Sequence, residues 1–314
     1  QILERRARLQ AASTSMSSEY VEELLAEVDA ALARIERGTY GLCETCHDPI
    51  EEDRLQANPL VRFCLDHLNA TERAAHEQDL ELATQIQSKL LPPACLTFGT
   101  WNTDFHYEPA GPVGGDYCEV EVLEDGQSLF FAVGDVAGKG VAASLLMTHL
   151  SAILRSLLSL RLPLAELMAR ANRLFCENTL TAHYATLVCG RATPNEVDLC
   201  NAGHCPPLLL GSESVNPVGV AGLPLGLFCG VEYPVTRVPV SAGESLVLYT
   251  DGVTEAHDPD GSEFGDSGLR RSLVRARGQD AAALRQAVVQ DVAAFRRGAR
   301  PSDDLTLLVL RRRE

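Results

Sequence analysis

The stretch LFFAVGDVAGKGVAASLLM, residues 129–147, decides the fold of this chain of 314 residues. Its beginning, LFFAVGD, is an apolar run that ends in a polar turn, which predicts a strand. The residues from 141 to 158 then predict a helix. Asp135 therefore lies at the end of a strand, in a turn whose glycines keep other side chains away from its carboxylate.

Three further motifs also place an aspartate at a strand end or in a turn. They are Gly114-Gly115-Asp116, Tyr249-Thr250-Asp251-Gly252 and Ser302-Asp303-Asp304. One such aspartate is common for backbone reasons alone, but four motifs allow carboxylates from separate strands to converge. Converging carboxylates repel one another and would bind protons unless divalent cations neutralise them. Hard oxygen ligands favour Mg²⁺ or Mn²⁺, and two such ions about 4 Å apart can activate water for attack on phosphorus.

The chain around these motifs alternates between short strands and helices. The strand candidates are the runs YCEVEVL, LFFAVGD, YATLVCG, LVLYTDG and LTLLVLR, and the helix candidates are 141–158, 164–178 and 280–297. The pattern begins at about Cys95 and continues to the C-terminus.

This ordered series resembles the metal-dependent (PPM-type) protein phosphatases, in the SpoIIE/RsbU branch of bacteria. The resemblance covers about residues 78–312 and rests on LELATQIQSKLLPP, VGGDY, AVGDVAGKGVAASLLM, NAGHCPPLLL, GLPLGL, LVLYTDGVTEA and SDDLTLLVLR. It implies an α+β fold in which two antiparallel sheets form a β-sandwich flanked by helices. The metals are then expected at one edge, between the sheets.

The resemblance also implies the roles of the site residues, with two Mn²⁺ or Mg²⁺ ions as catalytic cofactors. Asp135 is expected to bridge both metals, and the backbone carbonyl of Val136 to bind one of them. Asp251 and Asp303 are expected to complete the other metal, and Asp116 to act at the metal centre through water. The expected catalytic residues are therefore Asp116, Asp135, Asp251 and Asp303.

Four other polar residues lie in or beside these motifs. Asp304 is expected to support the metal ligands rather than bind a metal directly. Lys139 either attracts the phosphate or is a solvated lysine in a turn. His204 suggests a general acid, but a structural histidine in a turn between two strands is the favoured interpretation, and Asn201 is interpreted likewise.

A second metal site is predicted near the N-terminus. Cys43-x2-Cys46 and Cys64-x2-His67 are separated by seventeen residues, a spacing typical of a structural Zn²⁺ held by four ligands. His47 follows Cys46 directly and is sterically awkward as a second ligand, so His67 is preferred. A segment this small has too little core to fold without the metal.

The residues around these ligands resemble the DksA/TraR zinc finger, found in regulators of bacterial RNA polymerase. The resemblance covers residues 18–68 and is most specific in GTYGLCETC, RLQANP and FCLDH. Two features depart from that family: the last ligand is His67 rather than cysteine, and the tip STSMSSE lacks aspartates. We therefore interpret the module as a scaffold or a sensor.

An amphipathic helix precedes the zinc motif, with Val21, Leu24, Leu25, Val28, Leu32 and Ile35 at three- and four-residue spacing. The predicted divisions are a helical hairpin or coiled-coil arm at 1–42, a zinc finger at 43–70, a linker helix at 71–93 and a phosphatase domain at 94–314. The linker helix either packs within the chain or pairs with a second chain.

The composition excludes several other classes of protein. A formal net charge of −16 repels nucleic acid, so no nucleic-acid partner is expected. There is no run of about 18 apolar residues, so no membrane span is expected. The ten cysteines fall into the zinc cluster and seven scattered positions typical of small buried hydrophobic residues. The sequence thus favours a cytoplasmic protein.

These observations favour a bacterial signal-transduction enzyme that hydrolyses phosphoserine or phosphothreonine on a regulatory protein. The resemblance makes an anti-sigma-factor antagonist the favoured substrate class. The N-terminal module is expected to regulate the activity, with homodimerisation through the N-terminal helices as one route. The alternative is a zinc-finger transcription regulator that contacts RNA polymerase. An inactive phosphatase is disfavoured because no metal aspartate is missing.

Overall fold

The computed structural model describes residues 19–67, 70–179, 183–194 and 196–313, together with Ile2 and Arg6. Residues 1–18, which belong to the predicted helical hairpin, lie outside the described residues, apart from Ile2 and Arg6. The chain divides into two compact units, residues 1–79 and 80–314. The division falls inside helix α4 (Ala70–Leu90), so the predicted linker helix contributes to both units.

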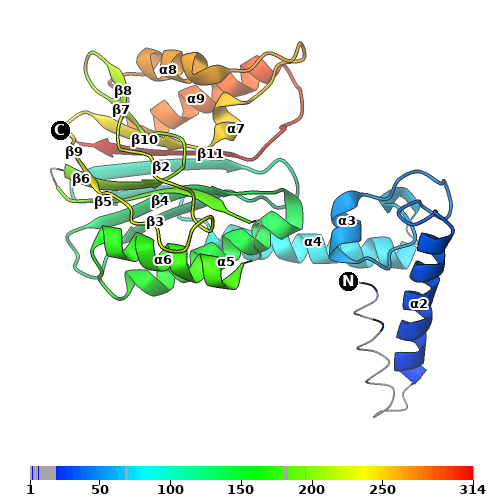
Figure 1. Ribbon diagram of the computed structural model, residues 1–314. Helices are drawn as coiled ribbons and strands as arrows, with labels where there is room; N and C mark the ends of the chain where they lie inside the picture. The colour runs from blue at the N-terminus through cyan, green and yellow to red at the C-terminus, as the bar shows by residue number, and fades with distance from the viewer. Residues whose placement is uncertain are drawn as a thin grey trace. The chain divides into compact units, whose positions relative to one another are not determined.

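The larger unit is built on two antiparallel sheets (Figure 1). The first sheet has the order β1-β2-β11-β10-β7-β8, with strands at Cys95–Phe98, Trp101–Glu108, Leu305–Arg312, Ser245–Tyr249, Leu208–Leu210 and Val215–Pro217. The second has the order β3-β4-β5-β6-β9, with strands at Tyr117–Val122, Leu129–Val136, Ala185–Ala192, Glu196–Ala202 and Thr236–Pro239. The predicted α+β sandwich is confirmed.

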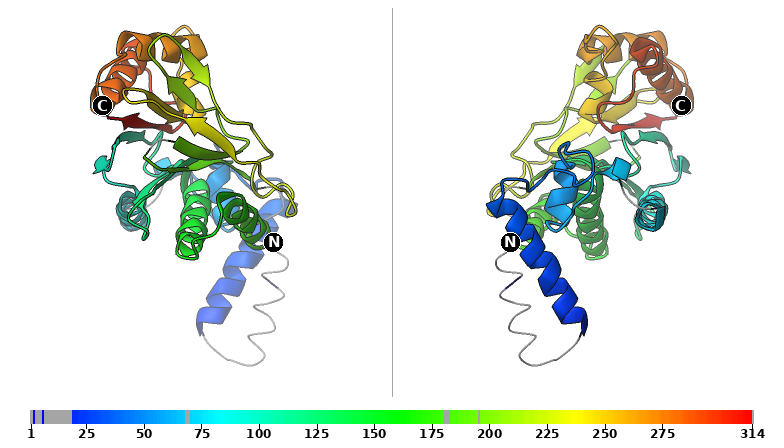
Figure 2. Two further views of the ribbon diagram at one scale, coloured as in Figure 1. Left: turned by 90° about the vertical axis from the view of Figure 1, so that its left-hand side faces the viewer. Right: turned by 90° about the vertical axis from the view of Figure 1, so that its right-hand side faces the viewer.

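Helices cover the outer face of each sheet, which gives four layers (Figures 1 and 2). Helices α5 (Gly140–Leu158) and α6 (Leu164–Asn178) pack on the second sheet. Helices α8 (Gly265–Arg275) and α9 (Ala281–Arg296) pack on the first sheet. A third apolar cluster, which includes Trp101, fills the space between the sheets.

Strand β4 shows how the sequence produces these layers. Phe130 belongs to the cluster under α5 and α6, and the next residue, Phe131, belongs to the cluster between the sheets. Successive side chains of a strand point to opposite faces, so an unbroken apolar run suits a strand that is buried on both sides. The apolar run LFFAVGD therefore forms strand β4, which has an apolar cluster on each of its faces.

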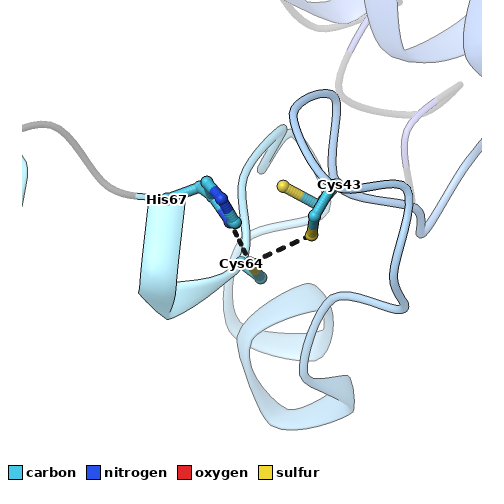
Figure 3. A group of neighbouring side chains, drawn as sticks. Cys43, Cys64 and His67 are labelled. Atoms are coloured by element: carbon cyan, nitrogen blue, oxygen red, sulfur yellow. Dashed lines mark hydrogen bonds between the residues drawn. The ribbon is translucent and has the colours of Figure 1, made fainter.

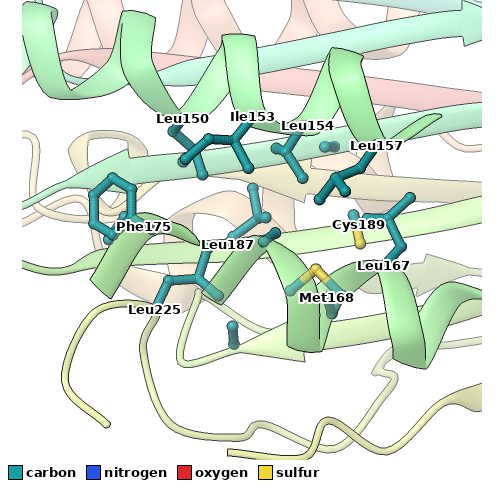
Figure 4. Packing of buried hydrophobic residues seen from close by; sticks show 14 of the residues in the cluster. Leu150, Ile153, Leu154, Leu157, Leu167, Met168, Phe175, Leu187, Cys189 and Leu225 are labelled. Carbon is teal, nitrogen blue, oxygen red and sulfur yellow. The ribbon is translucent and has the colours of Figure 1, made fainter. Parts of the chain in front are cut away.

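Helix α5 is long and apolar enough to cross a membrane by length and composition. About half of its most apolar window is buried inside the structure, and its inward residues, among them Leu150 and Leu154, belong to the cluster in Figure 4. A core helix, packed on a sheet along one face, has this pattern.

The smaller unit contains α2 (Glu19–Glu36), the short α3 (Glu52–Ala57) and a single 3₁₀ turn at Leu65–His67. Gly38 follows α2 with a φ of 70°, the left-handed conformation typical of a residue just past a helix end. Arg34 is buried, and its guanidinium donates to the carbonyl oxygens of Leu60 and Val61 at 3.1 and 3.3 Å. This arginine fastens α2 to the loop that carries the second pair of zinc-ligand candidates.

Candidate metal centre

The four aspartate motifs lie at the ends of strands from both sheets. Asp135 is the second-last residue of β4, and Asp116 immediately precedes β3, whose first residue Tyr117 pairs with Gly134. Asp251 follows β10 as the first residue of α7 (Asp251–Thr254), and Asp303 lies two residues before β11. The sandwich therefore brings motifs that are far apart in the sequence to one edge.

Three glycines allow the motifs to approach one another closely. A Cβ on Gly252 would lie 1.8 Å from the backbone oxygen of Asp304, and one on Gly114 would lie 2.1 Å from Oδ2 of Asp304. A Cβ on Gly115 would lie 3.1 Å from the carbonyl oxygen of Val136 and 3.5 Å from Oδ1 of Asp135. The oxygens that the sequence analysis selected as ligands thus face the Gly114-Gly115 segment.

Asp116 is held by two hydroxyl groups from the first sheet. Its side chain is buried, and Oδ2 accepts hydrogen bonds from Oγ1 of Thr250 at 2.9 Å and from Oγ1 of Thr306 at 2.6 Å. Thr250 Oγ1 in turn accepts a hydrogen bond from the backbone N–H of Thr306 at 2.9 Å. These bonds fix the orientation of the carboxylate and leave Oδ1 for another partner.

Asp304 and Asp303 behave differently although they are neighbours. Both oxygens of Asp304 accept backbone N–H groups, from Ala110 at 2.7 Å and from Gly115 at 2.6 Å. Asp304 therefore anchors the segment before Asp116, which fits the expected supporting role. Asp303 instead forms an ion pair from Oδ2 to Nζ of Lys139 at 3.0 Å.

Burial, and then neighbouring carboxylates, raise the pKa of Asp116, Asp135 and Asp251. Burial, followed by the charges of Asp251, Asp303 and Asp304, raises the pKa of Asp135 to about 7. Burial and then the charge of Asp303 raise the pKa of Asp251. Burial also raises the pKa of Asp116 well above its usual range, despite the hydroxyl groups that oppose this. A site that concentrates negative charge in this way fits divalent cations.

The sequence analysis missed the hydroxyls of Thr250 and Thr306 and the side chain of Gln87. Gln87 lies on α4, where Nε2 donates to the carbonyl of Gly114 at 2.7 Å and Oε1 accepts the N–H of Gly114 at 3.1 Å. All three residues lie inside quoted motifs. Their partners, Asp116 and the backbone of Gly114, are distant in the sequence, so the motifs alone did not reveal these contacts.

His204 and Asn201 form a closed turn away from free solvent. The N–H of His204 donates to Oδ1 of Asn201 at 2.8 Å, and Nδ2 of Asn201 donates to the carbonyl of His204 at 3.1 Å. His204 Nδ1 lies 2.8 Å from the hydroxyl of Thr186, and burial lowers its pKa to about 4. A neutral, buried imidazole fits the structural interpretation.

The zinc-ligand candidates come together in the smaller unit (Figure 3). The ligand atoms of Cys43, Cys46, Cys64 and His67 all lie within 4.8 Å of one another. Sγ of Cys46 is 3.8 Å from Sγ of Cys64, which is 3.2 Å from Nδ1 of His67. Two thiolates at about 2.3 Å from one tetrahedral Zn²⁺ are about 3.8 Å apart, so the cluster fits zinc. His47 is not in it.

Among the described residues, Cys43, Cys46, Cys64 and His67 are the one group in which three or more His, Cys, Asp or Glu ligand atoms all lie within 4.8 Å of one another. The oxygens of Asp135, Asp251 and Asp303 are not packed that tightly in the structure. Burial opposes ionisation of Cys43, but the N–H groups of Cys46 and Cys64 outweigh it and lower the pKa of that thiol to about 6.

Solved structures share the fold of the larger unit. The SiaA-PP2C domain of Pseudomonas aeruginosa is 21% identical with a TM-score of 0.67, covering 77% of this chain and 99% of that one. The catalytic domain of the serine/threonine protein phosphatase PstP, solved with two manganese ions, is 15% identical with a TM-score of 0.52, covering 68% of this chain and 99% of that one. The fold is therefore that of a PP2C-type phosphatase domain.

Residues 125–313, more than half of the chain, match the family Stage II sporulation protein E (SpoIIE). The chain belongs to the SpoIIE family. Residues 38–66 match the prokaryotic dksA/traR C4-type zinc finger, a range that ends one residue before His67. Both resemblances expected from the sequence are confirmed.

Two relatives match across most of this chain. Protein IcfG of Synechocystis sp. is 26% identical over 264 residues, which are 74% of this chain and 41% of that protein. Phosphoserine phosphatase RsbU of Bacillus subtilis is 24% identical over 241 residues, which are 76% of this chain and 71% of that protein. The chain thus spans about two fifths of the length of IcfG.

Proposed function

We propose that the protein is a metal-dependent serine/threonine protein phosphatase that hydrolyses phosphoserine or phosphothreonine on a regulatory protein. The observation that carries this proposal is the convergence of Asp116, Asp135, Asp251 and Asp303 at one edge of the sandwich, where burial and the charges of Asp251 and Asp303 raise the pKa of Asp135. The name of the relative RsbU, a phosphoserine phosphatase, supports the same reaction.

The residues that would hold two Mn²⁺ or Mg²⁺ ions are those selected from the sequence. Asp135 would bridge the ions, the carbonyl of Val136 would bind one, and Asp251 and Asp303 would complete the other. When bound, such a pair supplies a water that loses a proton near neutral pH and positive charge beside the transferring phosphoryl group. Asp116, with Oδ2 held by two hydroxyls, would use Oδ1 to orient a water at the centre.

The test is phosphate release from a phosphoserine peptide in the presence of Mn²⁺. The wild-type protein is expected to release phosphate, and Asp135→Asn to lose nearly all of that activity. Asp198→Asn is the matched control, because Asp198 lies on β6 in an ion pair with Arg237. Absence of release from the wild type, or equal release from Asp135→Asn, would refute the proposal.

The finer substrate class that we propose is an anti-sigma-factor antagonist, as the resemblance to the SpoIIE/RsbU branch implies. A cytoplasmic location remains a prediction from the sequence. Candidate antagonists that carry one phosphoserine provide the test, with dephosphorylation followed by mass. A rate no higher than that for an unrelated phosphopeptide would reject this class.

Regulation by the N-terminal module is proposed to act through α4. This helix carries Gln87, which holds the backbone of Gly114 two residues before Asp116, so a shift of α4 would move that segment. Pairing of the N-terminal helices in a homodimer is one way to move α4. Cys43→Ser with Cys46→Ser in the full chain should change the Mn²⁺ dependence or the oligomeric state, and no change in either would reject this regulation.

The second candidate function is a transcription regulator that contacts RNA polymerase through the zinc module. The match of residues 38–66 to the dksA/traR zinc finger favours it. Co-purification of RNA polymerase with the wild type but not with the Cys43→Ser, Cys46→Ser variant would support this alternative.

A further inference from the structure

Lys139 lies at the aspartate cluster in an unusually open position. It is the residue before α5, and the glycines on both sides have positive φ, 117° at Gly138 and 67° at Gly140. No atom lies within 4 Å of where a Cβ would stand on either glycine. The Lys139 side chain itself is 66% exposed, so its ammonium group has room to take more than one position.

The ammonium group of Lys139 occupies one of the proposed metal ligands. Nζ lies 3.0 Å from Oδ2 of Asp303 and donates to the carbonyl oxygen of Ser302 at 2.7 Å. Its charge also lowers the pKa of Asp251, although burial and Asp303 raise that pKa overall. An ammonium and a divalent cation that use the same carboxylate compete for it, because both satisfy the same negative charge.

The choice of lysine is informative in this chain. Lys139 and Lys89 are its two lysines, among 27 basic residues. An arginine would hold a carboxylate with two parallel hydrogen bonds, whereas an ammonium on a flexible stem is a point charge that exchanges partners and binds phosphate readily. A lysine at this position is therefore suited to leave Asp303.

We propose that Lys139 is an exchangeable counter-ion of the phosphatase site. It neutralises Asp303 until a divalent cation takes that carboxylate, and the released ammonium group then binds the phosphoryl oxygens of the substrate. A phosphoryl group beside a cation held by Asp303 lies within reach, since Nζ already contacts that residue. The inference rests on the proposed function and adds a substrate-binding residue to it.

Two binding measurements on the full-length, zinc-loaded protein test this inference. The first is calorimetric titration of Mn²⁺ into the wild type and into Lys139→Gln. Loss of the competing charge should tighten Mn²⁺ binding about three- to tenfold. The second is titration of inorganic phosphate into the Mn²⁺-loaded proteins, where Lys139→Gln should bind phosphate several-fold more weakly.

The opposite signs of the two effects would show that the charge of Lys139 acts at the metal and phosphate site. The Lys139→Arg variant tests whether this charge must leave Asp303. Lys139→Arg keeps the charge but can hold Asp303 with two parallel hydrogen bonds, so it should bind Mn²⁺ more weakly than the wild type. Lys89→Gln removes an exposed charge on α4 and should change neither value.

The results separate failure of this inference from failure of the proposed function. If the wild type binds no Mn²⁺, the proposed function fails and the inference with it. If the wild type binds Mn²⁺ but Lys139→Gln binds Mn²⁺ and phosphate as the wild type does, only the inference is overturned. Equal shifts in Lys89→Gln would likewise overturn it, because they would reflect net charge alone.

Discussion

At the residue scale, Gly252 shows how strongly the proposed site restricts single positions. A Cβ at Gly252 would lie 1.8 Å from the backbone oxygen of Asp304, and neither backbone can move without shifting a proposed metal ligand. The clash is between main-chain segments, so no change of rotamer can relieve it.

We expect Gly252→Ala to lower the free energy of unfolding by about 1–3 kcal/mol, the usual cost of an overpacked site. Urea unfolding followed by circular dichroism measures this change. Gly230→Ala is the matched control, because a Cβ there meets no atom within 4 Å. An unfolding midpoint of Gly252→Ala equal to that of the wild type would contradict the close approach.

His204 gives a prediction about pH. Burial lowers its pKa from 6.5 to about 4, so between these values the unfolded chain binds a proton that the folded chain does not. The free energy of unfolding is therefore not reduced by this histidine above pH 6.5, and it falls as the pH decreases from 6.5 toward 4. The loss between pH 7 and pH 5 is expected to be about 2 kcal/mol.

Urea unfolding at the two pH values checks this, with His204→Asn as the comparison. The variant should lose about 2 kcal/mol less than the wild type between pH 7 and pH 5, because the titrating imidazole is gone. Equal losses would show that His204 is not buried as a neutral side chain.

At the scale of the elements, two side chains join helix α4 to the segment before Asp116. The hydroxyl of Thr84 donates to the carbonyl oxygen of Pro112 at 2.9 Å. Gln87 exchanges two hydrogen bonds with the backbone of Gly114. We expect Gln87→Ala to raise the Mn²⁺ concentration needed for half-maximal phosphatase activity about tenfold, a typical cost of losing a group that supports metal ligands.

Gln85→Ala is the matched control for this change, because Gln85 is an exposed glutamine of the same helix. It should need the same Mn²⁺ concentration as the wild type. A Gln87→Ala enzyme with an unchanged Mn²⁺ requirement would show that α4 does not position the site.

The elements that the sequence predicted are those with a local pattern. Apolar runs predicted the strands β3, β4, β5, β10 and β11. The helix candidates at 141–158, 164–178 and 280–297 correspond to α5, α6 and α9. Helix α8, GDSGLRRSLVR, escaped notice because its glycines and arginines hide a short apolar face. Strand β2, WNTDFHYE, has many polar residues, and its pairing with β11 depends on a partner some two hundred residues away.

The same distinction holds for the site. Asp135 and the other three aspartates were accessible from the sequence, because each lies at or next to a strand end in a short motif, and three of the four lie beside glycine. The hydroxyls that hold Asp116 and the amide of Gln87 were not, because only the packing of distant segments brings them there. Sequence motifs therefore identified the proposed ligands but not the groups that orient them.

At the scale of the whole molecule, the two units are expected to differ in what stabilises them. The larger unit has three extended apolar clusters. The smaller has two small clusters, one of them made largely of the zinc-ligand candidates. A core of that size needs a metal to remain folded.

Cys46→Ser should therefore abolish stoichiometric zinc and remove the thermal transition of the smaller unit, while the transition of the larger unit persists. Elemental analysis and scanning calorimetry measure both properties. Cys95→Ser, at an exposed cysteine outside the cluster, should retain zinc and both transitions. A zinc-free Cys46→Ser protein with both transitions intact would contradict this division.

The account depends most on the capacity of the aspartate cluster to hold divalent cations. Calorimetric titration of Mn²⁺ into the zinc-loaded protein measures this directly, with Asp135→Asn and the Asp198→Asn control alongside. We predict two bound Mn²⁺ ions for the wild type and the control, and at least about tenfold weaker binding for Asp135→Asn. A wild-type protein that takes up no Mn²⁺, or an Asp135→Asn variant that binds it equally well, would contradict the account.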